Sequence, residues 1–97
     1  MLLLPATLTS REARDTLRML KQVLEREGGD GPVVVNAVPL QQLDSSALAV
    51  LLEIERLAGA WGRAFVVRAA PPKLAALAKL YGVEGLLLSP EEPGLPG

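Results

Sequence analysis

Three consecutive polar residues, Asp44-Ser45-Ser46, stand where a loop meets a long apolar run, and they are the side chains best placed to do chemistry. Two interpretations of this turn are open. In the first, Asp44 only caps a helix, because its carboxylate can accept a hydrogen bond from an amide of the first turn. In the second, Ser45 is a functional hydroxyl, since the free amides and the dipole of a helix N-terminus favour a phosphate there.

Hydrolytic or metal-dependent chemistry at Ser45 is disfavoured by composition. The chain has no His and no Cys, so a serine nucleophile would lack its usual base, and thiolates, disulfides and the main transition-metal ligands are excluded. No motif brings a lysine close to Ser45 as a substitute base. The glycine-rich segment 28–31 follows a predicted helix and precedes a predicted strand, which reverses the order found in a phosphate-binding loop. We therefore predict that the chain is not an enzyme and that it holds no metal and no cofactor.

Length, charge and hydropathy limit the class of protein further. A chain of 97 residues suits a single domain; we place it at 1–88, followed by a Pro- and Gly-rich segment, 89–97, that is typical of a flexible tail. Ten Lys and Arg against 11 Asp and Glu argue against nucleic-acid binding. No apolar run approaches the ~20 residues of a membrane span, and the apolar start is too short for a signal peptide. We expect a cytoplasmic protein that does not insert into a membrane.

The elements that would position the turn alternate between strands and helices. Strands are predicted at 2–8, 33–38, 63–68 and 86–88, and helices at 9–27, 44–59 and 71–81. Thr9 and Glu12 fit a capping box at the start of the first helix, and the apolar run at 33–38 is typical of a strand buried on both faces. Strands joined by helices favour a largely parallel sheet with right-handed crossovers. We therefore predict a single α/β domain in which three helices pack a small sheet with 33–38 at its centre.

The second predicted helix carries apolar residues on two sides. At about 100° per residue, a core face is formed by Ala47, Val50, Leu51, Ile54 and Ala58. A second group lies on the other side, where a surface helix would normally be polar; it consists of Ser45, Leu48, Ala49, Leu52 and Arg56. Either another segment of the same chain covers Leu48 and Leu52, or these residues form an exposed patch for another protein.

The segment that begins at Val33, VVVNAVPLQQLDSSALAVLLEIERLA, resembles the centre of STAS domains. In that family a buried strand leads through a loop into Asp-Ser/Thr-x-Gly/Ala-Leu and an apolar helix. Two further segments add to the resemblance: LPATLT before the first helix, and LAKLYGV at the end of the third, which is similar to the MlaB-type branch. Ala47 stands where Gly is commoner, Asn36 where Asp is frequent, and Val38 and Pro39 replace small polar residues. The resemblance implies a STAS-like fold, here without the family's usual N-terminal strand.

The resemblance implies a function in two alternative forms. The MlaB-type branch implies a non-catalytic accessory subunit that binds the ATPase subunit of an ABC transporter, with its permease, and supports phospholipid transport and outer-membrane lipid asymmetry. That subunit would be cytoplasmic and peripheral to the inner membrane through its partner. The other form is an anti-sigma-factor antagonist, a switch controlled by a serine kinase that phosphorylates Ser45. Both forms put Ser45 at a protein interface, so we expect an exposed partner-binding stripe, with Arg56 at its rim, formed by Ser45, Leu48, Ala49, Leu52 and Arg56.

Overall fold

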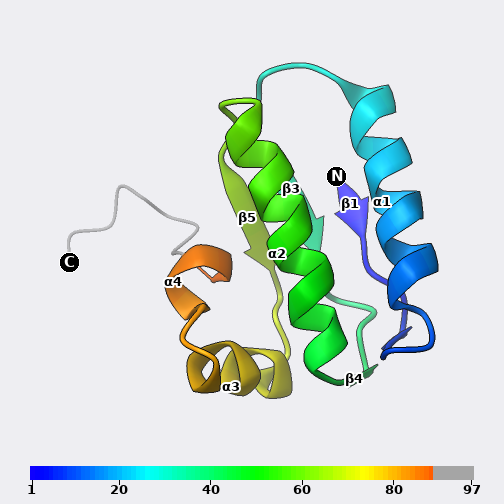
Figure 1. Ribbon diagram of the computed structural model, residues 1–97, viewed down its shortest axis with the longest axis vertical. Helices are drawn as coiled ribbons and strands as arrows, with labels where there is room; N and C mark the ends of the chain where they lie inside the picture. Colours follow the sequence, from blue (N-terminus) through cyan, green and yellow to red (C-terminus); the bar gives the residue numbers. More distant parts are fainter. Residues whose placement is uncertain (89–97) are drawn as a thin grey trace.

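One or two short strands precede each of the first three helices along the chain, and a fourth helix follows (Figure 1). The computed structural model describes residues 1–88. The strands are β1 (Leu2–Leu3), β2 (Thr7–Leu8), β3 (Val33–Asn36), β4 (Gln42–Leu43) and β5 (Phe65–Arg68). The helices are α1 (Ala13–Glu27), α2 (Ser45–Ala60), α3 (Pro72–Leu80) and α4 (Glu84–Leu87). The flexible tail predicted at 89–97 lies outside the described residues.

Residues 1–88 form a three-stranded sheet in the order β1-β3-β5, and both of its pairings are parallel. β3 is therefore central, as predicted. A separate parallel pairing joins β2 to β4. The predicted first strand is divided between the two sheets at Pro5, because proline has no amide to donate to a ladder. Since β4 ends one residue before Asp44, the β2–β4 pair helps to fix the start of α2.

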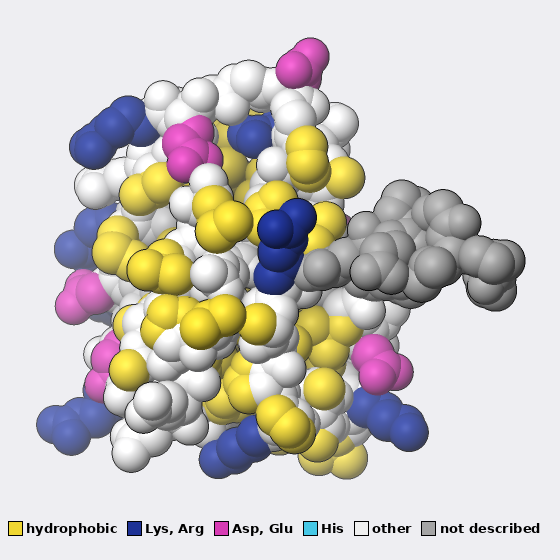
Figure 2. All heavy atoms as spheres, turned by 180° about the vertical axis from the view of Figure 1, so that it is seen from behind, with side chains coloured by type: hydrophobic (Ala, Val, Ile, Leu, Met, Phe, Trp, Pro, Cys, Tyr) yellow, Lys and Arg dark blue, Asp and Glu magenta, His cyan; other side chains and the backbone are white. Residues whose placement is uncertain are grey.

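The two long helices, α1 and α2, cover the same face of the three-stranded sheet (Figure 1). This follows from the strand order, because two right-handed crossovers that advance in one direction place their helices on one side. In β3, Val33 and Val35 are buried, whereas Val34 is only half-buried. The prediction that 33–38 is buried on both faces is therefore wrong, and Val38, just beyond the strand, is 67% exposed. Figure 2 shows the opposite side of the molecule, which α1 and α2 leave uncovered, with hydrophobic side chains spread over it.

The predicted core face of α2 is confirmed. Its five residues are each at most 2% exposed: Ala47, Val50, Leu51, Ile54 and Ala58. From α1, Leu20 and Leu24 are buried in the same core, and Leu17 packs against it. This shared core holds both helices on the sheet and sets the orientation of α2.

The capping box predicted before α1 forms only in part. The Glu12 carboxylate accepts hydrogen bonds from the Thr9 hydroxyl (2.6 Å) and the Thr9 amide (2.9 Å). These bonds lower the pKa of Glu12. The Thr9 hydroxyl thus donates to the carboxylate instead of accepting from a first-turn amide, and α1 begins at Ala13 rather than directly after Thr9.

The end of the described chain is helical where the sequence predicts a strand. Residues 84–87 form α4, so the strand predicted at 86–88 is wrong. A run of three leucines does not distinguish a strand from one turn of a buried helix. Here Gly82, with a φ of 73°, turns the chain after α3, and α4 then buries Leu87 while Leu86 stays 53% exposed. α4 packs against α2, α3 and β5.

Truncating the core face of α2 tests this packing. Leu51→Ala or Ile54→Ala should lower the free energy of unfolding by about 2–5 kcal/mol, because each side chain is fully buried and its loss leaves a cavity. Urea denaturation followed by circular dichroism measures the effect. Leu80→Ala is the control, since Leu80 is 76% exposed and should change stability by less than about 0.5 kcal/mol. A loss below about 1 kcal/mol at both core positions would mean that α2 buries a different face.

Candidate docking site at the start of α2

Asp44 fixes the start of α2. Its backbone is extended (φ −134°, ψ −167°), and its Oδ1 accepts a hydrogen bond of 2.8 Å from the Ser46 amide. Its Oδ2 accepts a second bond, of 3.3 Å, from the Ser10 amide in the loop before α1. The bond from Ser46 is the main reason why the pKa of Asp44 is lowered, because amide donors stabilise the charged carboxylate. One side chain therefore caps α2 and ties it to the loop that precedes α1.

Ser45 is the first residue of α2, and it is exposed. Its neighbour Ser46 is half-buried and donates its amide to Asp44. The capping interpretation of the turn therefore describes Asp44. The exposure of Ser45 means that another protein can reach its hydroxyl, which leaves the functional interpretation open for that residue.

The five residues of the predicted stripe do not share one environment. Ser45, Ala49 and Arg56 are exposed and Leu52 is half-buried, but Leu48 is only 4% exposed. The expectation of an exposed Leu48 is therefore wrong. The reason is that α3 and α4 pack against α2 and bring Leu48 into the hydrophobic core. For Leu48, the first of the two interpretations holds, and another segment of the same chain covers it.

An open groove remains beside Leu48. It has a volume of about 350 Å³ and is lined by Ser45, Leu48, Ala49, Leu52, Tyr81 and Val83. The first four residues belong to α2, and the last two belong to the turn between α3 and α4. The lining is apolar apart from the Ser45 hydroxyl and the ring hydroxyl of Tyr81, so this α2 groove suits an apolar side chain.

Tyr81 and Val83 belong to the α2 groove, but the predicted stripe does not include them. From the sequence, both residues are explained by the end of the third helix and the turn at Gly82. The only hint in the sequence is that Leu80 and Tyr81 place two large side chains at the end of a helix; that they are 76% and 58% exposed is known only from the structure. What the sequence did not contain was their proximity to α2, which depends on how α3 and α4 pack.

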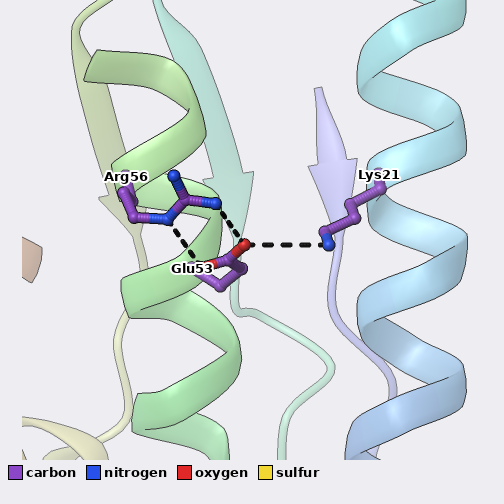
Figure 3. Close-up of polar contacts among 3 residues, drawn as sticks. All are labelled: Lys21, Glu53 and Arg56. Carbon is purple, nitrogen blue, oxygen red and sulfur yellow. Dashed lines mark hydrogen bonds and ion pairs between the residues drawn. The ribbon is translucent and has the colours of Figure 1, made fainter. Parts of the chain in front are cut away.

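A charged cluster lies farther along α2, on the side away from the sheet (Figure 3). The Glu53 carboxylate accepts hydrogen bonds from Arg56 Nε (2.9 Å) and Nη2 (2.6 Å). The Nζ of Lys21, from α1, lies 3.7 Å from the same carboxylate. The hydrogen bonding to Arg56 is the largest cause of the lowered pKa of Glu53. This Lys21–Glu53–Arg56 cluster links α1 to α2 and holds Arg56 in one orientation.

The side chains on this part of α2 offer a contact surface. It combines an apolar groove, a hydroxyl at the first turn and a charged cluster farther along. Within residues 1–88, no three acidic side chains gather where they could hold a metal ion. None of the helices in that range has the length and the apolar character needed to cross a bilayer.

Comparison with known proteins gives one match. The family model described as "Mlab, STAS domain" matches residues 2–89. The chain belongs to the STAS domain family, in its MlaB-type branch. No curated protein and no solved structure matches it significantly. The resemblance inferred from the residues is therefore confirmed, and the α/β fold with parallel strands agrees with it. As a STAS domain, the chain is a regulatory or accessory module of a family that generally acts through contacts with other proteins rather than by catalysis.

Two departures of this STAS domain from the family's usual motif have a clear place in the structure. Ala47, where Gly is commoner, is completely buried, so its methyl group packs in the core and does not alter the exposed surface. Asn36, where Asp is frequent, ends β3, and its Oδ1 accepts a hydrogen bond of 3.0 Å from the Val38 amide. An amide oxygen therefore orders the first turn of the loop that leads toward α2.

Mutation of the cap tests how firmly the start of α2 is fixed. At pH 7, Asp44→Ala should lower the free energy of unfolding by about 1 kcal/mol, because the Ser46 amide loses its acceptor. Asp44→Asn keeps an acceptor oxygen and should lose less, which makes it the matched control. Chemical denaturation measures both losses. If Asp44→Ala is as stable as the original protein, the cap contributes nothing to the fold.

The same residue predicts a pH dependence. The pKa of Asp44 is lower in the folded protein than in the unfolded chain. The contribution of the charged carboxylate to the free energy of unfolding is therefore complete above the unfolded pKa and is lost as pH falls through the folded pKa. The stability difference between the original protein and Asp44→Asn should therefore shrink as pH falls below the ordinary value of 3.8. Denaturation curves collected at a series of pH values check this, and a difference that stays constant down to low pH would contradict it.

Proposed function

We propose that this STAS domain is a non-catalytic accessory subunit that binds the ATPase subunit of an ABC transporter. In this role it supports the assembly or activity of a phospholipid transport complex, together with the permease, and so contributes to outer-membrane lipid asymmetry. It lies at the cytoplasmic side of the inner membrane through its partner. The observation that carries the proposal is the α2 groove, an open apolar recess beside the exposed Ser45, in a chain of the MlaB type.

The α2 groove supplies the binding free energy in this proposal. Leu52 is half-buried and Tyr81 is 58% exposed, so a partner side chain that fills the groove removes apolar surface from water on both walls. Burying a large apolar side chain completely stabilises a complex by about 1.5–3 kcal/mol, and aromatic residues in interface pockets are frequent hot spots. Ala49 is small and exposed, which allows a partner segment to approach α2 closely.

The domain would act on the ATPase by contact alone. The segment 28–31 runs from α1 into β3, so it does not have the strand-to-helix order of a phosphate-binding loop. In this proposal the ATPase binds and hydrolyses the nucleotide. Leu51 and Ile54 hold α2 against the sheet, so the α2 groove has its shape before the ATPase binds. A groove that is already formed lowers the entropy cost of docking.

A second candidate is a switch controlled by a serine kinase, and the exposure of Ser45 at the first turn of α2 favours it. A phosphate at that position would gain from the helix dipole. It would also stand next to the Asp44 carboxylate, which already occupies the Ser46 amide and repels a second negative charge. Because of this repulsion, the ATPase subunit remains our first candidate for the partner.

Co-purification separates the two candidates. The tagged domain is produced in its native host and isolated with its bound proteins, which are then identified by mass spectrometry. An ABC ATPase with its permease supports the first candidate, and a serine kinase with an anti-sigma factor supports the second. Recovery of neither contradicts both.

Blocking the α2 groove tests the docking surface. Ala49→Arg places a long side chain in the groove, and we expect it to weaken binding to the ATPase by at least about tenfold, since the apolar contacts are lost. The fold should be unaffected, because Ala49 is exposed. Ala64→Arg is the matched control: Ala64 is also exposed, but it precedes β5 at the opposite end of α2. Size-exclusion chromatography and calorimetry measure binding, and equal affinity for both variants would exclude the groove.

Negative charge at Ser45 provides an independent test. Ser45→Asp should weaken ATPase binding with little loss of stability, because an acid is tolerated in the first turn of a helix. Ser45→Ala removes the hydroxyl without adding charge and should have a much smaller effect on binding. If Ser45→Asp unfolds the domain, or binds as tightly as the original protein, then Ser45 is not at the interface.

A further inference from the structure

The charges on the outer side of α2 are unevenly exposed. The cluster in Figure 3 contains one carboxylate, Glu53, and two cations, Lys21 and Arg56. The Glu53 side chain is 28% exposed, whereas Lys21 is 40% and Arg56 is 64% exposed. The Lys21–Glu53–Arg56 cluster therefore has one net positive charge, and its cations face solvent more than the anion that holds them.

Glu53 holds Arg56 without using all of its donors. Arg56 donates from Nε and Nη2 to the two oxygens of Glu53. A guanidinium has five N–H donors in a rigid planar fork, so Nη1 can still donate to a second carboxylate. Because the pair with Glu53 already fixes the Arg56 side chain, binding a second carboxylate costs less rotamer entropy.

The cluster continues the line of the α2 groove. Arg56 follows Leu52 by four residues and Ala49 by seven, so these residues lie on one side of the helix. At 1.5 Å per residue, Arg56 stands about 6 Å beyond Leu52 along the helix axis. One short partner segment can therefore fill the groove and reach the cluster.

A purely structural role for the cluster explains less of this geometry. Exposed ion pairs stabilise a fold only slightly, and Lys21 is a loose partner for Glu53 at 3.7 Å. The shorter contacts, 2.6 and 2.9 Å, join Glu53 to Arg56 on the same helix, so they add nothing to the link between α1 and α2. What they fix is the direction of an exposed guanidinium.

We propose that the Lys21–Glu53–Arg56 cluster binds a carboxylate of the partner ATPase, from an Asp or Glu that lies a few residues from the apolar side chain in the α2 groove. This inference rests on the proposed function. It gives the partner segment a definite chemistry, apolar at one position and acidic at the other. It also extends the docking surface to α1 through Lys21, a residue that no sequence pattern singles out.

Charge reversal in the complex with the ATPase tests the inference. Arg56→Glu should weaken binding by about tenfold or more, since it turns a close attraction into a repulsion, and Lys21→Glu should weaken it by a smaller factor. Arg26→Glu is the matched control, because it makes the same change of net charge on α1 but lies about 140° around the helix from Lys21. Calorimetry at two salt concentrations measures binding, and thermal melting checks that each variant is folded. Arg56→Gln replaces the reversal if the latter disturbs the fold.

A reciprocal change completes the test. Replacing the Asp and Glu residues of the ATPase by Lys, one at a time, should produce one variant that restores binding of Arg56→Glu. If Arg56→Glu and Lys21→Glu bind as tightly as the original protein while Ala49→Arg does not, this inference is wrong and the proposed function stands. If the original protein does not bind the ATPase at all, both are wrong.

Discussion

Helix α2 has to bury two of its sides at once. The side with Leu51 and Ile54 packs in the core between the long helices and the sheet. The side with Leu48 is covered where α3 and α4 pack against α2. The exposed residues of α2 lie along the remaining side of the helix, and this strip carries Ser45, the groove and the charged cluster. Because close-packed side chains on both sides resist any rotation of the helix, the strip has one orientation before a partner arrives.

The start of α2 is fixed by polar contacts as well as by packing. Asp44 accepts from the amides of Ser46 and Ser10, and the β2–β4 pair ends one residue before it. The hydroxyl of Ser45 therefore stands at a defined point on the surface, although the residue itself is exposed. An Asp-Ser pair is a weak sequence signal by itself. It becomes informative here because the surrounding structure holds the acid in the cap and leaves the hydroxyl free to be contacted.

Periodicity in the sequence predicted the parts of the fold that depend on one element at a time. The core face of α2 and the central position of β3 follow from apolar spacing and from the alternation of strands and helices. Apart from the strand predicted at 86–88, which is helical, and the partly formed capping box, the errors concern relations between elements. Spacing identifies Leu48 as part of a second apolar side but does not say which segment covers it. The apolar composition of β3 predicts a strand that is buried on both faces of the sheet. The strand order instead places both long helices on one face, so Val34 is only half-buried.

The candidate site was predicted in the same partial way. The residues contributed by α2 could be found from their spacing, because they lie within one helix. Tyr81 and Val83 could not be found in this way, since β5 and α3 separate them from α2 in the sequence. They line the groove because the chain turns at Gly82, which stands between them. Lys21 joins the surface through the packing of α1 beside α2, which is equally invisible to a pattern within one element.

Apolar side chains are exposed at several places on the described part of the chain, and the outer face of the sheet and the groove on α2 differ as docking sites. On the face of the sheet that α1 and α2 leave uncovered, Leu3 is 55% exposed, and Val34 and Val66, which pair in register, are half-buried. Figure 2 shows hydrophobic side chains spread over this side of the molecule. An apolar sheet face can attract a partner, but similar side chains along parallel strands do little to fix the direction of the partner segment.

The strip on α2 has a recess of about 350 Å³, a hydroxyl at one end and a net positive cluster beyond the other. Different groups at the two ends define both the direction and the register of a bound segment, and electrostatic complementarity contributes to specificity more than to affinity. Specific recognition of one partner therefore favours the strip on α2 over the open side of the sheet.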